Sequence, residues 1–101
     1  MIVKRSIALA SVAAHALWIA DDNPRAAERF LDAVERTLRT LERNPMSGIA
    51  FDTVVPELQG LRKLRVSGFP RHLIFYQPIR GGIRFVKLLH TSRNIPDALE
   101  A

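Results

Sequence analysis

Two periods of apolar residues divide the chain into a helical first half and a stranded second half. Between residues 25 and 43 one apolar stripe recurs at helical spacing and charged residues fill the other positions, so this segment is predicted to form an amphipathic helix. The stripe consists of Ala27, Phe30, Leu31, Val34, Leu38 and Leu41. Asn23 is expected to cap the helix, Pro24 to begin it and Asn44-Pro45 to end it.

An alanine-rich segment predicts another helix over Ile7–Asp22, with Ser6 as its N-cap. Its apolar positions at helical spacing are Ile7, Ala10, Ala14, Leu17 and Trp18. Small residues at positions 8, 10, 13, 14 and 16 would let another element approach this helix closely. Because only Asn23 separates the two helices, we expect an antiparallel hairpin, preceded by a short edge strand at residues 2–5.

Three runs in the second half have the length and the bounding Gly and Pro residues of strands: Leu61–Ser67, Arg71–Gln77 and Ile83–His90. Turns at 68–70 and 78–82 separate them. Residues 46–59 show no regular period, and a turn of helix is expected at Asp97–Ala101. The predicted fold class is α+β, with an N-terminal strand, a helical hairpin and a three-stranded antiparallel meander in one domain, 1–101.

Alternation within the last two strands places large apolar side chains on both faces of the sheet. One face is expected to carry Leu73, Phe75 and Gln77, and the other His72, Ile74 and Tyr76. In the last strand Ile83, Phe85, Lys87 and Leu89 are expected to oppose Arg84, Val86, Leu88 and His90. Two helices can cover only one face, so we expect an apolar patch rimmed by basic residues, which is typical of a binding surface. The alternative is that segment 46–59 and the tail cover this face themselves.

The distribution of charge favours an acidic partner. The chain carries a net charge of +5, and Leu61–Arg93 contains eight Lys and Arg residues but no Asp or Glu. Such asymmetry is typical of proteins that bind an acidic protein or a nucleic acid. A solvated basic surface without any partner is the plainer alternative.

Composition excludes several classes of protein. The chain has no cysteine, which rules out disulfides and thiolate chemistry and fits a reducing compartment. No apolar run is long enough to span a bilayer. The first twenty residues superficially resemble a signal peptide, but Trp18 and Asp21-Asp22 suit a cleavage site poorly, so we expect a cytoplasmic protein that does not bind membranes.

Motifs for catalysis are sparse. There is no phosphate-binding glycine loop, and His15, His72 and His90 lack metal-ligand spacing, so neither a metal nor a cofactor is expected. RNA cleavage by basic residues is the remaining chemistry, because Arg62, Arg65, Arg71, Arg93, His90 and Tyr76 could move a proton or stabilise charge at phosphorus. The same residues could instead bind an acidic peptide, which we favour.

Motifs along nearly the whole chain resemble those of ParE toxins in the RelE/ParE superfamily, the toxin half of type II toxin–antitoxin modules. The matching stretches are residues 18–24 (WIADDNP) with Ala26-Ala27 and Phe30, Asn44-Pro45 with Gly48, residues 60–62 (GLR), residues 68–76 (GFPRHLIFY) and residues 86–94 (VKLLHTSRN). The resemblance implies a helical hairpin against a small antiparallel sheet, in agreement with the fold predicted from the residues.

The resemblance also implies a ParD-like antitoxin whose acidic C-terminal segment neutralises the toxin in a hetero-oligomer, and DNA gyrase as the target. No bond chemistry and no sequence-specific DNA binding by this chain alone are then expected. Ribosome-dependent mRNA cleavage, as in RelE, is the alternative, but the tail after Arg93 lacks the Tyr, Lys and Arg typical of that branch. Two departures from the family pattern are Asn94, where an acidic residue is usual, and the first helix, whose alanine-rich outer face suits burial by a partner.

The residues predicted for each role come from the basic and aromatic surface of the chain. Antitoxin binding is assigned to Trp18, Phe30, Arg65, Arg71, Phe75, Phe85 and Lys87. Target binding is assigned to Arg62, Tyr76, His90 and Arg93. Were the chain a ribonuclease, the catalytic set would be Arg62, Arg65, Arg71 and His90.

Overall fold

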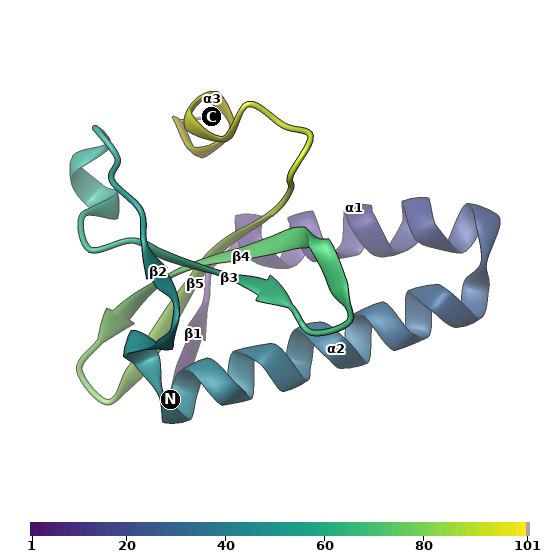
Figure 1. Ribbon diagram of the computed structural model, residues 1–101, viewed down its shortest axis with the longest axis horizontal. Helices are drawn as coiled ribbons and strands as arrows, with labels where there is room; N and C mark the ends of the chain where they lie inside the picture. Colours follow the sequence, from purple (N-terminus) through teal and green to yellow (C-terminus); the bar gives the residue numbers. More distant parts are fainter. Residues whose placement is uncertain (101) are drawn as a thin grey trace.

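The computed structural model describes residues 1–100, with the backbone alone for Glu100, and confirms the α+β fold class (Figure 1). Its elements in order are β1 (Ile2–Lys4), α1 (Ser6–Asp22), α2 (Pro24–Arg43), β2 (Ile49–Ala50), β3 (Arg62–Val66), β4 (Phe69–Ile79), β5 (Gly82–His90) and α3 (Ile95–Glu100). Short 3-10 turns at Pro45–Ser47 and Pro56–Leu58 flank β2. Ala101, the end of the predicted C-terminal turn, lies outside the described residues.

The helical hairpin forms as predicted, and its two junctions follow from local chemistry. The Asn23 side chain accepts a hydrogen bond from the Ala26 amide at 3.1 Å and caps α2, while Pro24 takes the first helical position. The prediction that Ser6 caps α1 is wrong, because Arg5 occupies the N-cap and makes no side-chain cap bond. On α2, Leu31 of the predicted stripe is exposed, whereas Ala33 and Thr37 are buried.

The sheet contains five strands among the described residues, in the order β1-β5-β4-β3-β2, rather than a strand and a three-stranded meander. β1 pairs in parallel with β5, because the crossover through α1 and α2 returns the chain to the same edge. β2, which the sequence did not predict, adds two residues to the opposite edge. The two hairpin turns are tighter than expected, since Phe69-Pro70 and Pro78-Ile79 belong to β4, and Gly68 and Gly81 supply the positive φ.

A bulge corrects the predicted faces of β5. Phe75 pairs with Lys87 but Tyr76 pairs with Phe85, so Val86 is an extra residue and the alternation shifts there. Ile83, Phe85 and Leu88 therefore pack toward the helices, and Val86 and Leu89 toward the opposite face. Lys87 also lies on that opposite face, where its Nζ donates to the Ala98 carbonyl at 2.8 Å. The faces of β4 are as predicted.

The prediction of an uncovered apolar sheet face is wrong. Segment 49–61 and α3 close over it, and they contribute Leu58, Leu61 and Leu99 to a second core around Phe75. Figure 1 shows α3 on one side of the sheet and α2 on the other. The residues that cover this face lie far apart in an irregular loop and in the C-terminal tail, so no periodic pattern in the sequence predicted them.

Tyr76 joins the sheet to the end of α2. Its hydroxyl donates to the Pro45 carbonyl at 2.6 Å and accepts from the buried Gly48 amide at 2.9 Å. Burial raises the pKa of this phenol, partly offset by the Gly48 amide and the charge of Arg62. We expect Tyr76→Phe to lower the free energy of unfolding by about 1–2 kcal/mol, because the Gly48 amide loses its partner. Urea unfolding measures this change, and an unaltered midpoint would contradict it.

Candidate functional site

A continuous group of exposed apolar residues lies along α1, whereas other exposed apolar side chains, such as Met46, Ile49 and Val54, belong to the segment before β3. We call the following residues the α1 outer face: Ile7, Ala10, Ala13, Ala14, Leu17 and Trp18. All six are exposed, and Leu17 and Trp18 retain 70% and 68% of their accessible surface. The helix buries its other side through Ala8 and Ala16, with Val12 and Ile19 partly buried against the same core. The apolar positions identified in the sequence are therefore the solvent side of α1.

The buried side of α1 uses small residues, as the expectation of a close approach by another element required. Ala8 is fully buried, and the Ser11 hydroxyl reaches the sheet and accepts a hydrogen bond from the Leu88 amide at 3.0 Å. Small side chains allow α1 to lie close to β5, as the small residues predicted. No residue between Ser6 and Ala20 carries a formal charge with His neutral, so both sides of the helix are apolar.

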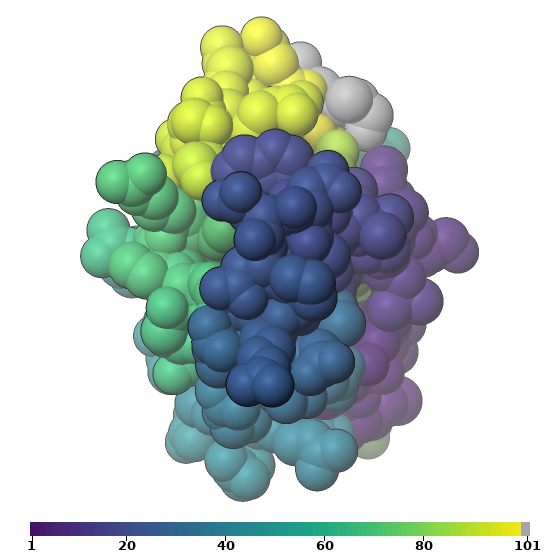
Figure 2. Space-filling view, turned by 90° about the vertical axis from the view of Figure 1, so that its right-hand side faces the viewer, coloured from purple at the N-terminus to yellow at the C-terminus, as the bar shows by residue number. Residues whose placement is uncertain are grey.

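Trp18 stands as a ridge between two hollows at the end of the hairpin. A hollow of about 310 Å³ on one side is lined by Ala14, His15, Trp18, His90 and Ser92. A second hollow of about 420 Å³ is lined by Trp18, Ile19, Asp21, Asp22, Asn23 and Ala26. Figure 2 shows this end of the hairpin, with the C-terminal half of α1 in dark blue between the C-terminal segment and α2. An exposed tryptophan between hollows is typical of an interface anchor.

Three histidines stack beneath this surface. His72 on β4 meets His15 on α1 edge to face at 5.2 Å between ring centroids, and His90 on β5 in the same way at 5.1 Å. His72 also packs on Phe30 at 4.9 Å, and neither of its buried ring nitrogens has a hydrogen-bond partner among the described residues. Burial, followed by the charges of His15 and His90, lowers the pKa of His72 to about 4.

The neighbouring histidines differ in environment. Burial lowers the pKa of His15, and the charges of His90 and Arg93 add to this effect. The Nδ1 atom of His90 accepts from the Ser92 amide at 3.1 Å and lies 2.8 Å from the Ser92 hydroxyl. Within residues 1–100, no group of three or more His, Asp or Glu side chains is placed to hold a metal ion.

The residues assigned to antitoxin binding fall into two groups in the structure. Phe30, Phe75 and Phe85 are fully buried in the two cores, so none of them can contact a partner in this conformation. Trp18, Arg65 and Arg71 are exposed. Lys87 is half-buried, and its pKa is lowered by burial and then by the charges of Arg93 and Arg5.

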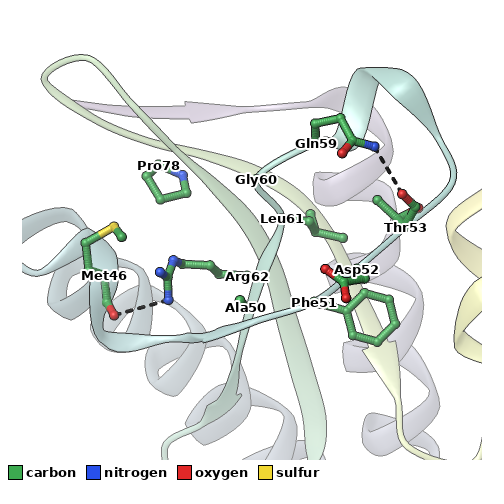
Figure 3. Close-up of a pocket in the computed structure, with 10 residues that line it drawn as sticks. All are labelled: Met46, Ala50, Phe51, Asp52, Thr53, Gln59, Gly60, Leu61, Arg62 and Pro78. Carbon is green, nitrogen blue, oxygen red and sulfur yellow. Dashed lines mark hydrogen bonds between the residues drawn. The ribbon is translucent and has the colours of Figure 1, made fainter.

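The residues assigned to target binding are also divided. Tyr76 is fully buried, whereas Arg93 is exposed and His90 lines the hollow beside Trp18. Arg62 lies elsewhere, in a pocket of about 500 Å³ between segment 50–53 and β3 (Figure 3). Its Nη1 donates to the carbonyls of Gly48 at 2.5 Å and Met46 at 3.4 Å, which fixes the guanidinium at the mouth of this pocket.

The residues assigned to RNA cleavage do not come together. Arg62 pairs with Tyr76 on one side of β4, and His90 pairs with His72 on the other. Four residues along β4 and two strand spacings across it separate these positions, about 13 Å and about 10 Å respectively. Arg65 opposes Leu73, so its side chain lies on the sheet face away from the helices, whereas His90 stacks on His72 at the helical face. No described pair of these residues shares a hydrogen bond.

Comparison with protein families identifies the group to which this arrangement belongs. The family described as the ParE toxin of the type II toxin-antitoxin system, parDE, matches residues 5–95. The chain belongs to the ParE toxin family. The match covers both helices of the hairpin and strands β2 to β5, and so includes the α1 outer face and the histidine stack. A search of curated proteins found no match to this ParE toxin.

The family assignment confirms the resemblance drawn from the sequence and makes the chain the toxin of a type II toxin–antitoxin module. Within the described residues, the toxin has no helix with the length and hydropathy needed to cross a membrane. The site residues assigned from the sequence omitted His15 and Ser92, which line the hollow beside Trp18. Helical spacing from Trp18 could have found Ala14 and His15, but Ser92 joins them only through the path of β5.

Proposed function

We propose that this ParE toxin acts in the cytoplasm by poisoning DNA gyrase and that a ParD-like antitoxin neutralises it. Membership of the family supports the antitoxin half of the proposal, because the family's description places the toxin in a parDE module. The single observation that carries the binding half is the exposed, uncharged outer face of α1, which ends at the Trp18 ridge. An apolar surface of this kind on a small basic protein favours a protein partner.

The antitoxin is proposed to lay an apolar helix along the α1 outer face and to place an anchor side chain in the hollow beside Trp18. The lining of that hollow is mostly apolar, which suits an aliphatic or aromatic anchor. Acidic residues of the antitoxin would lie over Arg93 and Arg71, which are exposed and make no ion pair within the described residues. Of the residues assigned to the antitoxin, Trp18 and Arg71 are retained in this proposal, whereas Arg65 and Lys87 lie on the sheet face away from the helices and are not.

Target binding is proposed for the far side of the molecule, where Arg62 is held at the mouth of its pocket. A guanidinium fixed by two backbone carbonyls is ordered before it meets a ligand, which lowers the entropic cost of binding. Gyrase and antitoxin would then approach different surfaces. His90 and Arg93 lie on the side proposed for the antitoxin. A bound antitoxin would therefore cover these two residues and keep them from the target.

RNA cleavage is the less favoured function because its proposed residues are dispersed. A general base must lie within hydrogen-bond reach of the proton that it removes, and a positively charged group must lie near the phosphorus. His90 is close to Arg93 but far along β4 from Arg62, and Tyr76 is buried with its hydroxyl engaged. Binding without bond chemistry needs no such convergence.

A cleavage assay with purified gyrase tests the proposal. We expect the toxin to convert supercoiled plasmid into linear DNA in the presence of gyrase and ATP, and Arg62→Ala to reduce this at least about tenfold. Arg80→Ala, at an exposed hairpin turn, is the matched control and should cleave as the unaltered toxin does. Rapid loss of mRNA on induction with intact DNA, and no effect on gyrase, would instead support the ribonuclease.

A further inference from the structure

Arg62 is a cation without a counter-charge in the pocket of about 500 Å³ that it lines. It forms no ion pair within residues 1–100, and its hydrogen bonds there run from Nη1 alone, to the carbonyls of Gly48 and Met46. The N–H groups of Nε and Nη2 therefore have no partner within the described part of the chain. A half-buried guanidinium with unused donors suits a ligand that carries an oxyanion.

The turn that holds Arg62 is itself held by Tyr76. The amide of Gly48 donates to the Tyr76 hydroxyl at 2.9 Å, and the carbonyl of Gly48 accepts from Arg62. No side chain fits at Gly48, because a Cβ there would collide with the Tyr76 hydroxyl and lie 2.9 Å from the Lys63 carbonyl. The guanidinium is therefore placed before any ligand arrives, through a turn that has little freedom to move.

Strand register explains why a pocket forms at this position. Arg62 pairs with Tyr76 of β4 and with Ala50 of β2, so the three side chains lie on the same side of the sheet. That side faces the helices, but α2 ends at Arg43, and the turn that follows it borders this part of the sheet instead. Figure 3 shows the Arg62 side chain between Met46 and Pro78, which line the pocket with it.

Asp52 brings a negative charge to the same pocket. It is exposed, and it forms no ion pair with Arg62 or with any other described residue. It follows Ala50 by two residues, which is about 7 Å along an extended chain. In Figure 3 the guanidinium is directed toward Met46 and away from Asp52. The pocket thus offers separate positive and negative groups, with Phe51, Leu61 and Pro78 between and around them.

Charges of both signs distinguish between the two classes of macromolecule that an arginine pocket can bind. A nucleic acid carries a phosphate at every nucleotide and would bring like charge against Asp52. A protein segment can carry a carboxylate for Arg62 and an ammonium or guanidinium for Asp52. Met46 and Ile49, which are 64% and 68% exposed beside the pocket, add apolar contact area of the kind that protein interfaces use.

We propose that the Arg62 pocket binds a protein segment of the target that presents one acidic and one basic side chain. The carboxylate accepts two parallel hydrogen bonds from Nε and Nη2 of Arg62, and the basic group donates to Asp52. This inference rests on the proposed function, which assigns target binding to this pocket. It adds Asp52 as a binding residue and makes the buried Tyr76 a positioning residue that acts through Gly48.

NMR titration of the whole toxin chain tests the pocket with a short blocked peptide that contains one Glu and one Lys among leucines. We expect the Nε–H resonance of Arg62 to shift and to saturate at about millimolar peptide, because two partly exposed charge pairs give weak binding. Peptides with Gln in place of Glu, or of Lys, should bind at least about threefold more weakly. Arg62→Gln should remove only the preference for Glu, and Asp52→Asn only the preference for Lys.

Tyr76→Phe tests the positioning role separately. Without the hydroxyl the turn is held less firmly, so the Nε–H resonance of Arg62 should broaden in the unliganded variant. The preference for Glu should fall at least about twofold, whereas the preference for Lys should stay as it is in the unaltered toxin. A variant that had merely lost structure would lose both preferences, which would reject the positioning role.

Control variants remove the same charges elsewhere. Arg80→Gln, at an exposed hairpin turn, and Asp32→Asn, at an exposed position on α2, should leave both preferences unchanged. An Arg62 resonance that the Glu–Lys peptide does not shift up to about 10 mM overturns the proposal, since the guanidinium would then serve only to close the turn. A single-stranded oligonucleotide that shifts this resonance when the peptide does not overturns it in favour of a phosphate ligand.

The titration contains no gyrase, so its outcome is independent of the test of the proposed function. Peptide binding at Arg62 by a toxin that leaves gyrase unaffected would reject gyrase as the target and keep the pocket. Gyrase cleavage by a toxin whose Arg62 does not respond to the peptide would reject the pocket and keep gyrase as the target.

Discussion

Phe30→Ala is expected to remove about 3–5 kcal/mol from the free energy of unfolding of the toxin. Phe30 is fully buried between α2 and the sheet, where its ring packs on Phe69 at 5.2 Å and on His72 at 4.9 Å. Truncation to alanine leaves a cavity that the surrounding side chains can fill only in part. Since a small domain has a total stability of about 5–15 kcal/mol, much of the variant should unfold near physiological temperature.

Trp18→Ala provides the matched contrast to Phe30→Ala. Trp18 is 68% exposed, so its truncation should change the stability of the free toxin by less than about 0.5 kcal/mol. The same change should weaken antitoxin binding at least about 30-fold, which is the usual effect of losing an interface anchor. Thermal unfolding and calorimetric titration separate the two effects. A Phe30→Ala protein that unfolds like the unaltered toxin would place this ring at the surface and contradict the structure.

The contrast between these two aromatic residues shows what the sequence could and could not reveal about α1. Period alone identified the helix and its length, because alanine propensity and helical spacing are local properties. It could not identify the buried side, since an uncharged helix has apolar residues all round. In the structure the side that faces β5 is formed by Ala8 and Ala16, with Val12 and Ile19 partly buried beside them.

The sheet shows a second limit, which arises from non-local geometry. The strands and turns were placed to within a few residues, and the faces of β4 were correct. A single extra residue at Val86 then moved Lys87 and Leu89 to the opposite face, because a bulge resets a period of two. No residue type marks this bulge. The covering of the second face depends on a tail that meets the sheet only in three dimensions, through Ala98 and Leu99.

The histidine stack had no sequence signal at all, since it brings together positions 15, 72 and 90 from three elements. It joins the face that we assign to partners with the core that holds α1 on the sheet. His15 lines the hollow beside Trp18, while His72 packs on Phe30. Protonation of any of these histidines therefore affects the packing of α1 on the sheet and not only one side chain.

Acid should destabilise the toxin through this stack. Protonation of His72 is expected to lower the free energy of unfolding by about 3 kcal/mol as the pH falls from 6.5 to 4. The pKa of His72 falls from 6.5 in the unfolded chain to about 4 in the folded one, so the unfolded chain binds more protons in this range. Stability is thus complete above pH 6.5 and declines as the pH falls toward 4. His15, whose pKa is also lowered, acts in the same direction, and the charges of His90 and Arg93 oppose protonation.

His72→Leu isolates this contribution. The leucine is close to histidine in volume and removes two buried nitrogens that lack partners among the described residues. We expect this variant to be at least as stable as the unaltered toxin at pH 5 and to lose much less stability between pH 7 and pH 4.5. Urea unfolding at a series of pH values measures both slopes, with carboxylate titration common to the two proteins. Equal dependence of stability on pH in the two proteins would mean that His72 is hydrated or paired in solution. The packing of α1 on the sheet would then depend on its small residues alone.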